Sequence, residues 1–392
     1  MVAMNRREML GVLAAGAAWF SCGGGAYAAA PTEKRFVFVI LRGAMDGLTA
    51  VPPLGDPNYL AARGAIAMAG DGGQCLPLNN LFALHPALPT LHALYHKQQA
   101  TIIHAVASPY RERSHFDAQD VLENGMAQAH AAQNGWLGRA LAAMSTVKGM
   151  AVGQNIPLAL RGGGEVSSWS PSYLPEAESD LLTRLGDLYQ GDKVLAPALH
   201  EALAADALAD SAMDGGDGKP KRGKNFLALA KAAGAFLAAP DGPRLAVLEI
   251  GGWDTHAGQG AFKGRLAGNL TQLDNGLAAL QQALGAVWAN TAILCATEFG
   301  RTVAANGTGG TDHGTGGAAF VLGGAVKGGK VIADWPGLAS NQLYQNRDLR
   351  PTTDLRAVMK GMLAGQFGLD SALLASKVFP DSADVRPISG LV

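Results

Sequence analysis

Short runs of aliphatic residues alternate with longer stretches of helical character along the chain. Four of the runs, at 36–41, 245–250, 291–297 and 318–322, have the length and composition of buried strands. Before the third run, leucines recur every three or four residues over 262–287, which predicts an amphipathic helix. Strands separated by helices are typical of a mostly parallel sheet, so the pattern predicts an α/β fold.

The same periodicities predict further elements. A leucine-rich stretch at 81–95 predicts a helix, although Pro86 and Pro89 would delay its start. The other predicted elements are strands at 100–106 and 157–160 and helices that start at Ser114 and within 352–354.

The four strands of the main pattern lead into or out of acidic residues and histidines. Asp46 follows the first strand, Asp254 and His256 follow the second, Glu298 ends the third, and His313 lies in a glycine-rich loop just before the fourth. Ligands of parallel sheets bind beyond the carboxyl ends of the strands. We therefore expect carboxylates and imidazoles from distant parts of the sequence to share one site for a metal ion.

Asp254, His256 and His313 are the best candidates for the metal ligands. An aspartate and a histidine two residues apart in a tight loop can converge on one ion. A second histidine completes a donor set that suits zinc, manganese or iron. The alternative is a turn aspartate and surface histidines in flexible loops, and the sequence alone leaves it open.

Asp46 and Glu298 are candidates for binding a second ion or for orienting a water molecule. Glu298 could instead form an ion pair with Arg301, one turn away if a helix starts there. Arg301 could instead hold an anionic group of a substrate, because its planar guanidinium fits phosphate and sulfate oxygens.

Ser114 has two interpretations. With Asp117 it makes an S-x-x-D pattern, so its default role is that of a helix N-cap. A hydroxyl at a helix N-terminus is also well placed as a nucleophile, because backbone N–H groups stabilise an anion there and a metal can lower its pKa. His115, directly after it, is a further candidate ligand.

The composition allows a sizeable core and argues against one class of partner. Of the 392 residues, 48% are hydrophobic and only 16% are charged. The net charge is −1, whereas a nucleic-acid-binding protein needs a basic face. We therefore expect no nucleic-acid partner.

Residues 1–30 are predicted to be a twin-arginine export signal. The adjacent Arg6 and Arg7 precede an apolar stretch at 9–20, which is too short to span a bilayer, and residues 26–28 form an A-x-A cleavage site. We expect the twin-arginine translocase to bind this segment and the mature protein to be periplasmic or secreted.

The mature chain, 31–392, is predicted to be one α/β domain with a helical insertion. Residues 175–240 are rich in alanine and leucine and contain no good strand. Within them, the polar and glycine-rich residues 213–224 predict a flexible loop.

Six motifs of the chain resemble an exported bacterial family that is named only as domain of unknown function 1501. In order they are RGAMDGL, PYRERSHFDAQD, GGWDTH, ATEFGRT, GTDHGTGG and RPTTDLRAVM, and the resemblance covers nearly the whole mature chain. That family looks like a member of the alkaline phosphatase and sulfatase superfamily. The resemblance implies a three-layer α/β/α sandwich around a mostly parallel sheet, with one or two divalent metal ions and a serine, threonine or formylglycine nucleophile.

The resemblance also implies roles for individual residues. Asp254, His256 and His313 look like the ligands of one metal, Asp46 looks like an aspartate of the second, and Ser114 stands where the nucleophile is expected. The superfamily commonly has an Asp-His pair where this chain has Glu298 and Phe299, and Phe299 cannot bind an ion. A C-x-P-x-R sulfatase signature is absent from the sequence, which argues against a formylglycine enzyme.

These observations predict a metal-dependent hydrolase of small phosphate or sulfate esters, or of a related anionic group. Ser114 or a metal-bound hydroxide would attack, and Arg301 would neutralise the charge of the substrate. The alternative is a non-catalytic metal-binding or assembly protein, or a partner of a co-secreted protein, whose site has lost part of the superfamily pattern.

Overall fold

The computed structural model describes residues 32–69, 74–144, 146–171, 177, 179–213 and 226–392. The export signal expected at 1–30 lies outside the described residues, and so does nearly all of the loop expected at 213–224. Both remain predictions.

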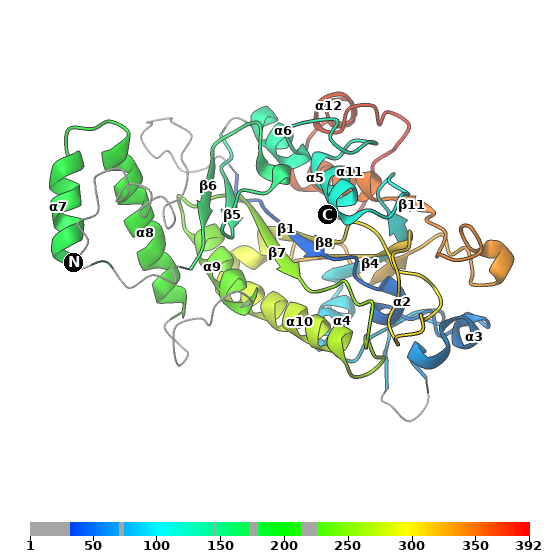
Figure 1. Ribbon diagram of the computed structural model, residues 1–392. Coiled ribbons are helices and arrows are strands. Elements are labelled where there is room, and N and C mark those ends of the chain that lie inside the picture. The colour runs from blue at the N-terminus through cyan, green and yellow to red at the C-terminus, as the bar shows by residue number, and fades with distance from the viewer. Residues whose placement is uncertain (1–31, 70–73, 145, 172–176, 178, 214–225) are drawn as a thin grey trace, which may run out of the picture.

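A mixed, mostly parallel sheet lies at the centre of the described part of the chain (Figure 1). Its strands are β1 (Arg35–Arg42), β4 (Ala100–Ala107), β5 (Gly149–Val152), β6 (Val166–Trp169), β7 (Leu245–Gly251), β8 (Thr291–Ala296), β9 (Gly317–Leu322), β10 (Lys330–Ile332) and β11 (Thr353–Asp354). Their order is β10-β4-β9-β8-β1-β7-β5-β6, and β11 pairs with β4. Among these strands, β9 alone runs antiparallel to its neighbours. A separate hairpin joins β2 (Leu76–Pro77) and β3 (Ala83–Leu84).

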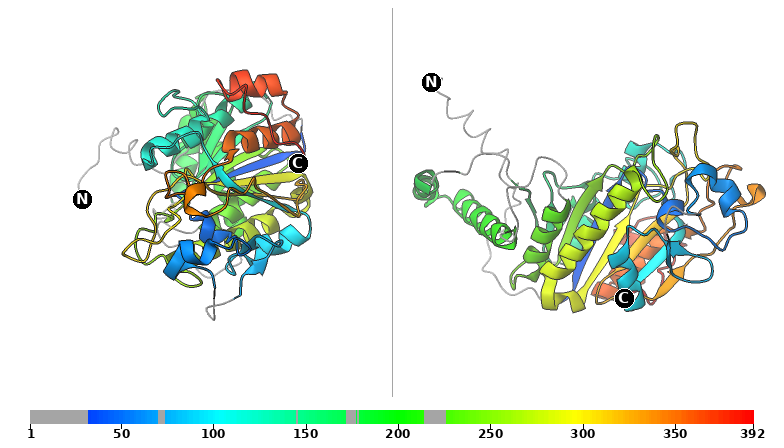
Figure 2. Two further views of the ribbon diagram at one scale, coloured as in Figure 1. Left: turned by 90° about the vertical axis from the view of Figure 1, so that its right-hand side faces the viewer. Right: turned by 90° about the horizontal axis from the view of Figure 1, so that it is seen from below.

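Helices cover both faces of the sheet, so the predicted three-layer α/β/α arrangement is confirmed (Figure 2). They are α2 (Gly47–Ala50), α3 (Tyr59–Arg63), α4 (Pro89–His96), α5 (His115–Asn124), α6 (Trp136–Ala143), α7 (Ser179–Tyr189), α8 (Leu195–Met213), α9 (Phe226–Ala238), α10 (Arg265–Leu284), α11 (Leu355–Phe367) and α12 (Ser371–Leu373). Side chains of β1 alternate between the faces, because successive residues of a strand point to opposite sides. Val37 and Val39 pack with α4, α9 and α10, whereas Phe36 and Phe38 pack with α6 and α11.

Helix α10 confirms the amphipathic pattern predicted for 262–287. Its buried face includes Leu266, Leu270, Leu273, Leu277, Leu280 and Leu284. Burial of each such leucine contributes about 1.5–3 kcal/mol. Helix α9 packs closely against α10, because Gly234 has no side chain: a Cβ there would lie 2.5 Å from the Cβ of Ala283.

Two predicted elements differ from the structure. Residues 158–160 form a 3-10 helix (Leu158–Leu160) and not a strand. The helix predicted at 81–95 begins only at Pro89, because proline suits the first turn and the buried carboxylate of Asp274 accepts hydrogen bonds from the backbone N–H groups of Thr90 and Leu91, both at 3.0 Å.

The region 175–240, predicted as a helical insertion, contains α7, α8 and α9. Helices α7 and α8 extend away from the sheet, while α9 lies on its face (Figures 1 and 2). Several large apolar side chains of the extension are exposed, among them Leu188 at 74%. None of the helices in the described ranges is both long enough and apolar enough to cross a membrane.

The direction of the strands explains where the candidate residues meet. Strands β1, β4, β7 and β8 run in the same direction and end at one edge of the sheet. Strand β9 runs in the opposite direction, so the loop before it reaches that same edge. Residues that follow four strands therefore meet the residues that precede the fifth.

Candidate metal centre

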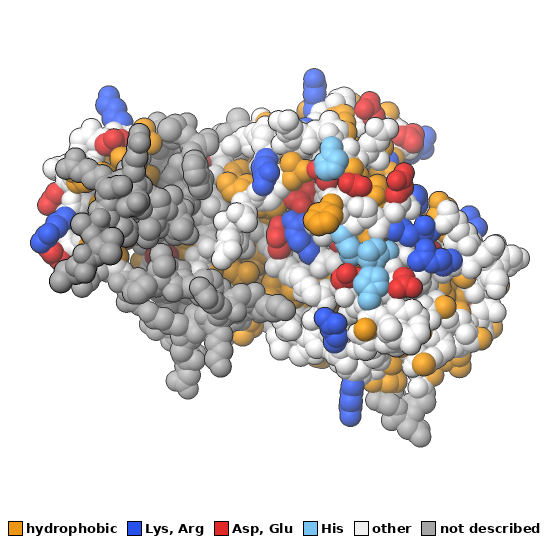
Figure 3. Space-filling view, viewed as in Figure 1, with side chains coloured by type: hydrophobic (Ala, Val, Ile, Leu, Met, Phe, Trp, Pro, Cys, Tyr) orange, Lys and Arg blue, Asp and Glu red, His pale blue; other side chains and the backbone are white. Residues whose placement is uncertain are grey.

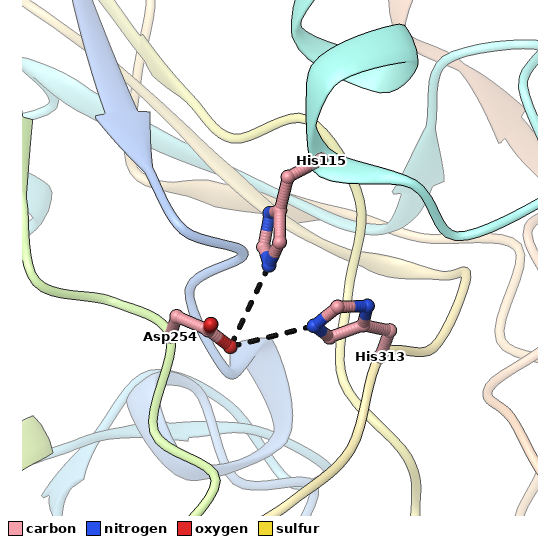
Figure 4. Close-up of side chains that lie close together, drawn as sticks. All are labelled: His115, Asp254 and His313. Carbon is pink, nitrogen blue, oxygen red and sulfur yellow. Dashed lines mark ion pairs between the residues drawn. The ribbon is translucent and has the colours of Figure 1, made fainter.

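Three imidazoles and one carboxylate converge at this edge of the sheet. Asp254 and His256 follow β7, His313 precedes β9, and His115 is the first residue of α5, which follows β4. Figure 4 shows the side chains of His115, Asp254 and His313 pointing toward one another. Gly43, after β1, lets the neighbouring loop approach: its φ is +118°, and a Cβ there would lie 2.6 Å from the backbone nitrogen of Asp254. The histidines form a group on one face of the molecule, with acidic and basic side chains around it (Figure 3).

The distances fit ligands around a single ion. Asp254 Oδ1 lies 3.5 Å from His115 Nε2, 3.5 Å from His313 Nε2 and 3.0 Å from His256 Nε2. A tetrahedral ion with bonds of about 2.0–2.1 Å separates its ligand atoms by about 3.3 Å. Among the described residues, His115, Asp254 and His313 form a group whose ligand atoms all lie within 4.8 Å of one another. His256 lies beside this group, with its Nε2 2.9 Å from that of His313.

The hydrogen bonds on the far side of each ring fix which nitrogen faces the centre. The Nδ1 atoms of His115, His256 and His313 lie 2.8 Å from Glu298 Oε1, 3.1 Å from Asp312 Oδ1 and 2.8 Å from the carbonyl oxygen of Arg113. These oxygens only accept, so each Nδ1 carries a proton. In a neutral ring, Nε2 then presents its lone pair to Asp254.

Three imidazole nitrogens and a carboxylate oxygen that face one another with lone pairs favour a positive charge between them. His115 Nε2 is buried and has no hydrogen-bond partner among the described residues. Burial lowers the pKa of His313, which favours its neutral form. This arrangement of donors fits a divalent cation such as zinc or manganese. Metal-binding histidines commonly donate their other N–H to a carboxylate or carbonyl, as these three do.

Glu298 is hydrogen-bonded to the candidate ligand His115 and is not itself placed as a ligand. It is fully buried, and its Oε1 accepts hydrogen bonds from His115 Nδ1 and from the backbone N–H of Gly43, both at 2.8 Å. The side chain of Gln119 donates to the same oxygen at 3.2 Å. Burial alone would raise the pKa of Glu298, but the bonds from His115 and its other donors keep its pKa below the usual value. The sequence suggested Glu298 as a metal ligand, whereas the structure places it as a hydrogen-bond partner of His115.

Arg301 is buried and pairs with the central carboxylate. Its Nη1 lies 2.6 Å from Asp254 Oδ1, and its Nε donates to the hydroxyl of Thr311 at 3.1 Å. Although burial opposes ionisation of Asp254, Arg301 lowers the pKa of Asp254 and keeps it charged. The alternative pairing of Arg301 with Glu298 does not occur, and its charge is already balanced by Asp254.

Asp46 does not join the group around Asp254. It is the N-cap of α2 and forms a buried ion pair with Arg63. Burial would raise the pKa of Asp46, but Arg63 and the donors of Gln259 and Thr49 hold it low. The structure thus does not bring Asp46 into the group around Asp254, and its oxygens accept from protein donors.

Ser114 lies between two residues that contact the centre. It is the N-cap residue of α5, as predicted, but its side chain makes no capping hydrogen bond, so the S-x-x-D bond pattern is absent. Its hydroxyl contacts Tyr110, which also donates to Asp117 at 3.2 Å.

The sequence offers His115 only as a further candidate, yet its ligand atom and those of Asp254 and His313 all lie within 4.8 Å of one another. The available signal was its place in the first turn of the helix after β4, whose carboxyl end meets the same edge as β7 and β8. The sequence does not show that a hydrogen bond to Glu298 would turn the ring of His115 toward Asp254.

The chain matches a family described as a protein of unknown function, DUF1501, over residues 33–378. The protein belongs to this family. A search of curated proteins found no match.

Solved structures with a similar arrangement include hydrolase-type proteins. One is a protein in the alkaline phosphatase superfamily from Vibrio parahaemolyticus, with a TM-score of 0.44 and 10% identity over 91% of this chain and 71% of that chain. Another is the phosphonate monoester hydrolase of Agrobacterium radiobacter, with a TM-score of 0.41 and 14% identity over 86% and 74% of the two chains. A third is the C-terminal periplasmic domain of EcEptC from Escherichia coli in complex with zinc, with a TM-score of 0.37 and 11% identity over 75% and 74%. The ligands and activities named for these proteins are theirs and are not assigned to this chain.

Proposed function

We propose that this DUF1501 protein is a metal-dependent hydrolase of phosphate or sulfate esters, or of a related anionic group. The observation that carries the proposal is the convergence of three imidazole Nε2 atoms on Asp254 Oδ1, each ring being fixed by an acceptor on its other nitrogen. A divalent cation bound there would stabilise the charge that develops on the ester oxygens.

The protein's own residues supply the remaining parts of the mechanism. Ser114 stands at the N-terminus of α5, where backbone N–H groups stabilise an anion. In a two-step route, the Ser114 oxygen forms a bond to phosphorus or sulfur while the bond to the departing alcohol breaks and the serine proton leaves with the alcohol. Water then attacks the same centre, restores the serine and releases the acid. In a one-step route, water attacks directly and Ser114 stays unmodified.

Hydrolysis assays test this proposal. The mature protein would be incubated with aryl phosphate, phosphodiester and aryl sulfate substrates in the presence of zinc or manganese. Turnover by the wild type and its loss in His313→Ala are expected, while His200→Ala, an exposed residue of α8, serves as the matched control. Loss of turnover in Ser114→Ala supports the two-step route, whereas retained turnover supports the one-step route.

A non-catalytic metal-binding or assembly protein is the second candidate. One observation favours it: Arg301, which is expected to receive a substrate anion, is already paired, and so is Arg42, the last residue of β1. Arg301 binds Asp254, and Arg42 binds Glu123 at 2.8 Å and also Glu249. A protein that retains zinc and shows no turnover on any of the three substrate classes would support this candidate.

Location and partners are also part of the proposal. Residues 1–30 motivate export by the twin-arginine translocase, and the exposed apolar side chains of α7 and α8 motivate contact with a co-secreted protein. Substitution of Arg6 and Arg7 by lysine should keep the chain in the cytoplasm, and normal export of that variant would contradict the assignment.

A further inference from the structure

Asp46, which the superfamily resemblance assigns to a second ion, is enclosed by hydrogen-bond donors. Its Oδ1 accepts from the backbone N–H groups of Leu48 at 3.0 Å and Thr49 at 3.3 Å. Its Oδ2 accepts from the Thr49 hydroxyl at 2.9 Å and from the Gln259 amide at 2.6 Å, and Arg63 adds an ion pair. A carboxylate offers about four lone-pair sites, so no site on Asp46 is left for an ion.

Arg63 is held firmly in this position. Its side chain is completely buried, and its Nη1 donates to the carbonyl oxygens of Thr302 at 3.1 Å and Val303 at 2.9 Å. Removing the guanidinium would leave these carbonyls and the Asp46 carboxylate unpaired in the interior, which is strongly unfavourable. The positive charge beside Asp46 is therefore a permanent part of the fold.

The side chains and backbone groups that contact Asp46 direct hydrogen-bond donors at its carboxylate. Leu48, Thr49, Gln259 and Arg63 all present donors to it. Within the described residues, the group of side chains that could hold an ion does not include Asp46. A second ion at this position would have to displace a buried guanidinium.

A chain of hydrogen bonds joins Asp46 to the candidate metal centre. Gln259 donates to Asp46, and its Oε1 accepts from the hydroxyl of Thr311 at 2.7 Å. The Thr311 hydroxyl accepts from Arg301, which pairs with Asp254. The rigid pair therefore positions the arginine that contacts the central carboxylate.

We propose that the protein binds one divalent cation per chain, and that Arg63 supplies as a fixed charge what a second ion would supply. Asp46 and Gln259 then act as positioning residues that hold Arg301 against Asp254. This inference rests on the metal centre of the proposed function, and it specifies the number of ions and the origin of the second positive charge.

Metal counting tests the proposal. Untagged mature protein would be saturated with zinc, freed of excess ion and analysed by mass spectrometry for zinc per chain. The measurement uses a His96→Gln background, because the Nε2 atoms of the exposed pair His92 and His96 lie 3.0 Å apart and would take up zinc adventitiously. One zinc per chain is expected in this background and with Asp46→Asn, and none with His313→Ala.

The possible outcomes separate this inference from the proposed function. Two ions per chain would overturn the single-ion centre and leave the hydrolase proposal standing, and loss of one of them in Asp46→Asn would place the second ion at Asp46. No bound zinc in the background protein would remove the centre itself and both proposals with it. The count in the background protein decides the question even if Asp46→Asn fails to fold.

The positioning role has its own measurement. Gln259→Leu should keep one zinc per chain but lower zinc affinity about tenfold in competition with a chelator, as changes behind a metal ligand commonly do. Unchanged zinc affinity in folded Gln259→Leu would overturn the positioning role.

Discussion

Asp254 and Asp46 both follow a parallel strand at the same edge of the sheet, yet their surroundings are opposite in kind. Asp254 faces the Nε2 atoms of three imidazoles and is 43% exposed, whereas Asp46 is surrounded by donors and is 1% exposed. Each carboxylate has an arginine partner, Arg301 or Arg63, but only Asp254 also faces imidazole nitrogens that could bind an ion. An aspartate at a strand end thus becomes an ion ligand or a structural anchor according to its neighbours.

Loss of the fixed charge should have the largest effect on stability. Arg63→Met leaves Asp46 buried without its partner, which costs about 3–5 kcal/mol of unfolding free energy. Urea unfolding would measure this loss. The matched control is Arg184→Ala, which breaks an exposed pair with Asp180 on α7 and should change stability by less than about 0.5 kcal/mol. Equal effects of the two variants would erase the distinction between the two aspartate environments.

Loss of an imidazole at the centre should chiefly affect metal binding. His313→Ala removes a ligand atom, so zinc affinity should fall by more than the roughly 10–100-fold that follows loss of a residue that only orients a ligand. Isothermal titration calorimetry would measure the change, with His200→Ala as the exposed control. Wild-type affinity in His313→Ala would show that the imidazoles meet for another reason.

Glu298→Gln should weaken zinc binding by about tenfold without abolishing it. Glutamine keeps an oxygen that can accept from His115 Nδ1 but removes the negative charge that increases the basicity of the ring. The same titration would report the change. An unchanged affinity would indicate that Glu298 acts only in packing.

The two environments should respond to acid in different pH ranges. The hydrogen bond and charge of Glu298 raise the pKa of His115 above 6.5, and zinc competes with protons for this ring, so zinc should begin to leave as the pH falls through that raised value. The pKa of Asp46 is lowered below 3.8, so its contribution to stability is complete above 3.8 and is lost only as the pH falls through the lower folded-state value. Zinc retention and unfolding, followed against pH, should therefore change in separate steps. Simultaneous loss of zinc and structure would contradict this.

The smallest effect is expected for Ser114. Its side chain makes no capping hydrogen bond, so Ser114→Ala should change the unfolding free energy by less than about 0.5 kcal/mol. The comparison is Asp354→Ala in α11, where the side chain caps the helix by accepting from Arg356 N at 2.8 Å and where a loss of about 1 kcal/mol is expected. Thermal unfolding of both variants would test this order.

The sequence by itself determined the central strands at 36–41, 100–106, 245–250, 291–297 and 318–322, the layers they imply and the edge at which Asp254, His256 and His313 gather. These features depend on local periodicity and on the common direction of parallel strands, and both can be recognised from residues that are close together in the sequence. The family motifs did not indicate which other residues the candidate site side chains would contact.

Only the tertiary structure decided what each carboxylate does. Glu298 turns to His115, 183 positions away along the chain, and Asp46 pairs with Arg63 and Gln259 instead of an ion. The reversed direction of β9 brings His313 to the shared edge. A carboxylate accepts hydrogen bonds from the donors that tertiary packing brings within reach. That packing depends on segments that are far apart in sequence.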